Sequence, residues 1–193
     1  MRSVYISIIL LGLTACTGIG YVATSDPNKL IDQANSLRRE DRLLLAEDVI
    51  RQAVEIAEEQ EDTSAMARAY LAYGNLYMSD LYINGRWKAK FKKLGTYDGT
   101  YMKSIENFSK CQDLYKQIGN GSGEATCLAG IGRAYAMRGE TDNACDYFKK
   151  SLATYNSAKQ AGGNFEEWYG EGTRYANFSE LIKAEFNKEE CGI

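Results

Sequence analysis

The sequence predicts an all-α fold, a stack of antiparallel helical hairpins, and three observations carry this prediction. Between Ala125 and Leu152, apolar residues fall on one face of each of two helices, with a short turn at 138–140 between them. Similar residue patterns recur with a period of about 40 residues. The 193-residue chain has a single proline and no long run of valine and isoleucine, which argues against a sheet.

This central hairpin alternates small and large residues, as closely packed helices require. Gly132 and Ala144 allow the two backbones to approach, and Tyr135 and Phe148 fill the space beside that contact. The succession resembles the tetratricopeptide repeat, a hairpin with a glycine and a tyrosine in its first helix and an alanine and an aromatic residue in its second. The resemblance implies a TPR-like superhelix, whose concave groove binds peptides or proteins.

The amino terminus has the pattern of an export signal followed by a tether. Residues 1–15 contain an apolar run too short to span a bilayer, and Leu13 to Cys16 resembles a bacterial lipobox, in which Cys16 is acylated after cleavage. An ordinary signal peptide and a membrane anchor are the alternatives. Residues 16–25 are the predicted tether. Thr17, in place of the aspartate of inner-membrane lipoproteins, favours the periplasmic face of the outer membrane.

The folded domain is predicted to span residues 26–193. Asp26 can cap the first helix, and proline at the next position suits a helix start, because the N–H that it lacks would have no helical partner. The repeats are expected to start near Pro27, Ala67, Ala125 and Phe165. The last repeat either forms another hairpin, with Tyr175 in its first helix and a turn near 177–179, or is a single capping helix.

The second repeat has 18 extra residues between its helices, and this insertion falls within about 79–100. Its Asn84-Gly85 pair is typical of a β-hairpin turn, and a strand here would separate its aromatic residues from its lysines. Five basic residues against two aspartates give it a charge of about +3, which suits an acidic protein partner or anionic headgroups. The alternative is a solvated loop whose aromatic residues pack against the repeats. The candidate contact residues are Arg86, Trp87, Lys88, Lys90 and Phe91.

The tetratricopeptide resemblance implies that one face of each first helix lines the concave groove. On this chain, that face gives the partner-binding candidates Arg38, Arg39, Arg68, Asn75, Arg133, Met137 and Tyr169. Asn35, Leu71, Met78 and Thr173 share the face. Several candidates are arginines on a chain of net charge −3, and a guanidinium can bind a carboxylate through two hydrogen bonds. An acidic protein partner is therefore predicted.

Four cysteines follow Cys16, and an even number in an exported protein is typical of disulfides. Cys111 and Cys127 lie on successive antiparallel helices on either side of one turn, so a disulfide between them is possible. Cys127 and Cys145 are placed almost as well across the next turn. Small buried thiols are the competing interpretation, because Cys111 and Cys191 occupy positions where the repeat requires a small residue.

The chain contains no histidine, which removes the commonest general base and metal ligand. No CxxC pair or histidine suggests a zinc site, and no spacing suggests a catalytic pair. We therefore expect a protein that is not an enzyme, with no cofactor, no bound metal and no nucleic acid partner. The pattern leaves the oligomeric state open.

An exported stack of helical hairpins is expected to be a protein-binding lipoprotein. The stretch from Gly20 to Pro27, followed by TPR-like hairpins, is similar to small lipoproteins that accompany lipase effectors of type VI secretion systems. That resemblance implies an immunity protein, which binds and neutralises a phospholipase in the periplasm. The alternative is a TPR scaffold, similar to the pilotins, for assembly of an envelope complex.

Overall fold

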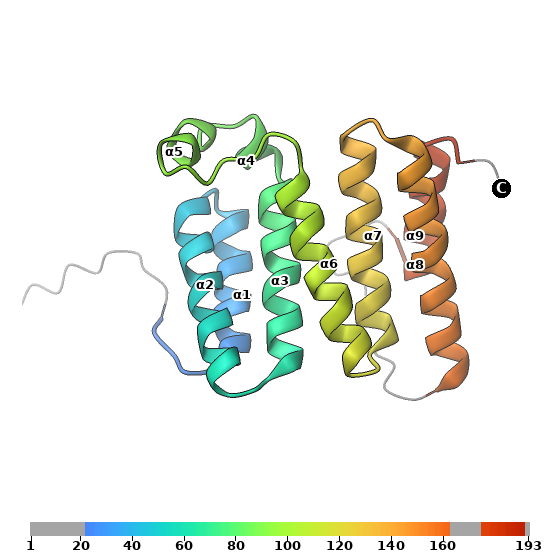
Figure 1. Cartoon of the computed structure of the whole chain (residues 1–193), viewed down its shortest axis with the longest axis horizontal. Coiled ribbons are helices and arrows are strands. Elements are labelled where there is room, and N and C mark those ends of the chain that lie inside the picture. Colours follow the sequence, from blue (N-terminus) through green and yellow to red (C-terminus); the bar gives the residue numbers. More distant parts are fainter. Residues whose placement is uncertain (1–21, 163–174, 192–193) are drawn as a thin grey trace, which may run out of the picture.

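The computed structural model describes residues 22–162 and 175–191, and every regular element in these ranges is a helix (Figure 1). The helices are α1 (Pro27–Arg39), α2 (Leu43–Glu59), α3 (Thr63–Met78), α4 (Asp80–Ile83), α5 (Lys88–Lys93), α6 (Met102–Gln117), α7 (Gly121–Met137), α8 (Thr141–Ala161) and α9 (Phe178–Lys188). The all-α prediction is confirmed.

The long helices pair in chain order as antiparallel hairpins: α1 with α2, α3 with α6, and α7 with α8. The second helix of each hairpin packs against the first helix of the next, so that α2 contacts α3 and α6 contacts α7. α9 packs on α8 at the end of the row. Figure 1 shows the hairpins stacked in one continuous row, with α9 behind α8 at its end. This is the TPR-like helical stack that the sequence predicts.

Side chains at several helix starts satisfy backbone N–H groups that a helix leaves without partners. The Asp26 carboxylate accepts from the amides of Asn28 and Lys29 at 3.0 and 3.3 Å, beside the proline that begins α1. Asp62 caps α3 and Asn120 caps α7 in the same way. Each such cap contributes about 1 kcal/mol. These capping residues explain why α1, α3 and α7, the first helices of the three hairpins, begin where they do.

Glycines allow close contact inside two of the hairpins. A Cβ added to Gly74 in α3 would lie 2.5 Å from the ring of Phe108 in α6. A Cβ added to Gly132 in α7 would lie 2.7 Å from the ring of Phe148 in α8. Because the same glycine and phenylalanine positions meet in both pairs, α3–α6 and α7–α8 are equivalent hairpins in the predicted register. The insertion between α3 and α6 leaves this packing unchanged.

The insertion itself is helical, so the β-hairpin predicted at Asn84-Gly85 is wrong. These two residues end α4, and their amides bond to the carbonyl of Asp80 at 2.8 and 3.0 Å. In α5 the inner positions are Trp87, just before the helix, and Phe91, whereas Ala89 is exposed. The two aromatic residues are four apart, a spacing that places them on one face of a helix as readily as on one face of a strand.

The insertion covers the end of the first hairpin, as Figure 1 shows. Tyr82, Ile83 and Phe91 are buried and belong to the same apolar core as α1, α2 and α3. The rings of Tyr82 and Phe91 meet edge to face with centroids 4.8 Å apart, a favoured geometry for aromatic pairs. The aromatic residues therefore pack against the repeats, as the alternative interpretation of the insertion expected.

The last described segment is one helix, α9. Phe178 stacks on Tyr155 of α8 with centroids 4.6 Å apart. Tyr175 was expected inside a first helix of a fourth hairpin, but it is not helical and lies just before Asn177, the N-cap of α9. The expected repeat start at Phe165 lies outside the described residues.

The chain ahead of α1 runs back alongside that helix, as Figure 1 also shows. The amide of Val22 donates to the Gln33 side chain at 2.6 Å, and the Gln33 amide group donates to the Val22 carbonyl at 3.0 Å. The predicted signal peptide, residues 1–15, and Cys16 lie outside the described residues. Within the described ranges, no helix combines the length and the apolar character needed to cross a membrane.

Candidate functional site

The candidate groove face lies along the first helices α1, α3 and α7, and ion pairs join it to neighbouring helices. Arg68 of α3 donates to Asn28 and pairs with Asp32 of α1 at 2.9 Å. Arg133 of α7 pairs with Glu185 of α9 at 2.8 Å. Both arginines were predicted to bind carboxylates of a partner. In the structure they already bind side chains of the same chain, which reduces what each would gain from a partner.

The Arg68–Asp32 pair also sets the register between α1 and α3. Both helices run in the same direction in Figure 1, and each rises about 1.5 Å per residue. Asn75, seven residues after Arg68, is therefore level with the stretch from Asn35 to Arg39, seven residues after the two partners of Arg68 in α1. The predicted candidates Arg38, Arg39 and Asn75 thus lie at one height, near the carboxyl ends of two adjacent helices.

Of these three candidates, Arg38 has a buried hydrogen-bond donor that lacks an acceptor. Its side chain is half-buried, and its Nε is buried without a hydrogen-bond partner. Burial, and secondarily the neighbouring charge of Arg39, lower the pKa of the Arg38 guanidinium below its usual value. No carboxylate pairs with it in the part of the chain that the structure describes. A carboxylate brought by a partner could pair with the accessible part of this guanidinium and offset the cost of its half-buried charge.

The remaining groove candidates differ in exposure. Arg39 is exposed and donates to Ser36 at 3.1 Å. Asn75 is partly buried. Met137 is 50% exposed, a large value for an apolar side chain. Tyr169, like Thr173, lies outside the described residues. Leu71 and Met78 pack against the apolar cluster around Phe108 and so form part of the stack.

Three of the partner-binding candidates in the insertion, Arg86, Trp87 and Phe91, instead attach the insertion to the repeats. Arg86 pairs with Asp41, in the turn between α1 and α2, at 2.6 Å. The indole N–H of Trp87 donates to the Asp41 carboxylate at 2.5 Å and to its carbonyl at 3.2 Å. Phe91 is fully buried, so its side chain is not available to a partner. Sequence reasoning missed Asp41, whose φ of 57° places it in the left-handed region that aspartate tolerates.

The lysines of the insertion stay at its surface. Lys90 is exposed, with its Nζ 4.4 Å from the centroid of the Trp87 ring. Lys88 is half-buried, with its Nζ 5.6 Å from the ring centroid of Tyr97. These cation–π contacts orient the ammonium groups without neutralising them. Of the five insertion candidates, only the two lysines therefore keep a charge that is free of ion pairs within the described residues.

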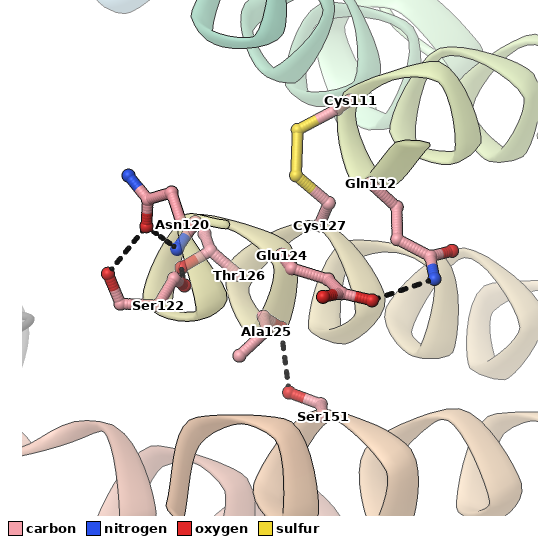
Figure 2. Close-up of a disulfide and its surroundings, with 10 residues drawn as sticks. Cys111, Gln112, Asn120, Ser122, Glu124, Ala125, Thr126, Cys127 and Ser151 are labelled. Carbon is pink, nitrogen blue, oxygen red and sulfur yellow. Dashed lines mark hydrogen bonds between the residues drawn. A yellow bond between two sulfur atoms is a disulfide. The ribbon is translucent and has the colours of Figure 1, made fainter. Parts of the chain in front are cut away.

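Two disulfides tie the later helices together. Cys111 of α6 is joined to Cys127 of α7, with Cα atoms 5.9 Å apart, as Figure 2 shows. Gln112 and Glu124 make a hydrogen bond between the same helices at 3.3 Å. The second disulfide joins Cys145 of α8 to Cys191, just after α9. Disulfides persist in oxidising environments, so the two bridges indicate an extracytoplasmic compartment.

A pocket of about 390 Å³ lies between the first hairpin and the insertion, away from the groove candidates. It is lined by Leu44, Glu47, Asp48, Arg51, Tyr73, Leu94 and Thr96. Its charged groups bind one another or nearby residues: Arg51 bonds to Asp48, and Glu47 accepts from the Tyr77 hydroxyl at 2.7 Å. Burial, with the nearby Glu47 charge, raises the pKa of Tyr77. These internal pairs do not single out a ligand.

Among the described residues, no group of three or more carboxylates and cysteines is placed to hold a metal ion. The groove face instead offers a half-buried guanidinium, amide groups and an exposed methionine, which suit a polypeptide.

A comparison with curated proteins gives no match. The model of the tetratricopeptide repeat family matches residues 96–157. This range contains α6 and α7 entirely and most of α8. The chain therefore contains a tetratricopeptide repeat domain within residues 96–157, and such a domain implies interaction with another protein.

Proposed function

We propose that the protein is a lipid-anchored protein of the bacterial envelope, that it is not an enzyme, and that it binds one protein partner through the groove face. The observation that carries the proposal is Arg38. A half-buried guanidinium that pairs with no carboxylate among the described residues, at about the level of Asn75 on the adjacent helix, is a site that an acidic group of a partner would complete. The tetratricopeptide repeat match supports a polypeptide as the ligand.

The most specific form of the proposal is an immunity lipoprotein that neutralises a type VI secretion phospholipase. The sequence from Leu13 to Cys16 and the resemblance over Gly20 to Pro27 support it. The two disulfides are consistent with a periplasmic position, where such a toxin would act. The outer membrane is the proposed place of anchoring, on the evidence of Thr17.

An inhibition assay tests this form of the proposal. The full chain is titrated into a secreted hydrolase encoded beside it, and lipase activity is measured at each ratio. We expect activity to fall in proportion to added chain and to vanish at one chain per hydrolase. Full activity at a large excess of chain would reject the immunity role. Capture of several envelope assembly components with no hydrolase would instead support the scaffold alternative.

A further inference from the structure

The insertion carries a cationic surface that the proposed groove does not use. We define the α5 surface as Lys88, Lys90, Lys92, Lys93 and Leu94. Three of the lysines are exposed and one is half-buried, and none pairs with a carboxylate in the described residues. Leu94 is 60% exposed at the end of α5. The surface therefore combines four uncompensated charges with one protruding apolar side chain.

Contacts within the insertion hold this surface in place. Lys90 lies over the ring of Trp87, and Lys92 has its Nζ 5.4 Å from the ring centroid of Tyr97. Both rings are fixed in turn, because Trp87 bonds to Asp41 and the Tyr97 hydroxyl donates to the Ile83 carbonyl at 2.9 Å. Lys90 and Lys92 are thus held over rings that are themselves bonded in place.

We propose that the α5 surface docks on an anionic membrane. Protein interfaces favour tryptophan, tyrosine and arginine at their centres and are poor in lysine. Around α5, Phe91 and Trp87 face inward and Arg86 is paired with Asp41, so the unpaired charged side chains at the surface are lysines, beside the exposed Leu94. Lysines near an anionic bilayer each contribute about 1 kcal/mol of attraction, and an apolar side chain can enter the headgroup region.

The chain ahead of α1 is long enough for an anchor at Cys16 to reach the level of the α5 surface. Val22 is held on Gln33, six residues before the end of α1, which corresponds to about 9 Å along the helix. Val22 lies six positions after Cys16, and a chain of that length spans at most roughly 20 Å. An acylated Cys16 can therefore reach the level of the insertion. The reach of Cys16 matters only if the proposed lipid anchor is present, whereas the attraction of the lysines to an anionic membrane does not depend on the anchor.

Hydrogen exchange on the membrane-bound protein tests the docking surface. The full chain is purified from membranes in detergent and reconstituted into phosphatidylcholine vesicles with or without phosphatidylglycerol. We expect the amides of residues 88–94 to exchange several-fold more slowly on the anionic vesicles. The double variant Lys90→Ser, Lys93→Ser should lose this protection, because two lysines are worth roughly a 25-fold change in membrane attraction. The control variant Lys116→Ser, Lys149→Ser, which changes exposed lysines of α6 and α8, should keep it.

Other results of this experiment would reject either the docking surface or the lipid anchor. Equal exchange of residues 88–94 on neutral and anionic vesicles would reject the docking surface. Protection that appears only after a partner protein is added, whatever the lipid, would assign the surface to protein binding and also reject it. Failure of the chain to remain with neutral vesicles would reject the lipid anchor of the proposed function, and exchange on anionic vesicles would still decide the docking surface.

Discussion

Replacing Phe91 with alanine is expected to lower the free energy of unfolding by about 3 to 5 kcal/mol. The ring is fully buried, packs edge to face on Tyr82 and belongs to the core of the first hairpin. Removing the ring leaves a cavity between the insertion and the repeats, and the free energy that its burial contributed is lost. Urea unfolding followed by far-UV circular dichroism measures the loss.

The matched control is Lys93→Ala, two residues further along the same short helix. Its side chain is exposed and makes no ion pair among the described residues, so the expected change in stability is within about 0.5 kcal/mol. If Phe91→Ala were as stable as Lys93→Ala, the burial of the insertion against the repeats would be contradicted. Phe91 would then return to the set of residues available to a partner.

Removing the disulfide between Cys145 and Cys191 is the second change with a large expected effect. Replacing both cysteines with alanine should lower the free energy of unfolding by about 4 kcal/mol, because the bridge closes a loop of 46 residues in the unfolded chain. α9 follows the segment 163–174, which the structure does not describe, and among the described residues it packs on the last hairpin, at the end of the stack. We therefore expect hydrogen exchange in α9 to accelerate most.

The other disulfide supplies an internal comparison. Alanine at both Cys111 and Cys127 opens a loop of 16 residues, for which the same relation gives about 3 kcal/mol. These cysteines join α6 to α7 in the middle of the stack, so amide exchange should rise across both helices instead of in α9. Wild-type stability in both double variants, measured without reductant, would show that neither bridge constrains the protein.

The hairpins were predictable because their signals are local. A glycine in one helix and a phenylalanine in the next, as in Gly132 and Phe148, identify a close crossing without knowledge of distant parts of the chain. The insertion was not predictable in the same way. Its Trp87 and Phe91 fit both a strand face and a helix face, and the residue that decides the matter, Asp41, lies 46 positions before Trp87.

In the candidate site, too, the sequence predicted local features but not the contacts between distant residues. Sequence patterns located the first-helix arginines, but the partners of Arg68 and Arg133 lie 36 and 52 residues away, on other helices. Whether such an arginine is paired within the chain depends on the register between helices, which a pattern does not contain. The Cys145–Cys191 bridge was missed for a similar reason, since it depends on the position of α9.

The central claim is that the groove face around Arg38 binds one protein partner. The most direct measurement is affinity capture of the full chain from the envelope of its own species, followed by mass spectrometry and stoichiometry. The Arg38→Met variant removes the charge and keeps an apolar stem, and Arg51→Met on α2 is the control. We predict one protein bound one to one by wild type and control and lost with Arg38→Met. Equal recovery of the partner with all three chains would contradict the claim.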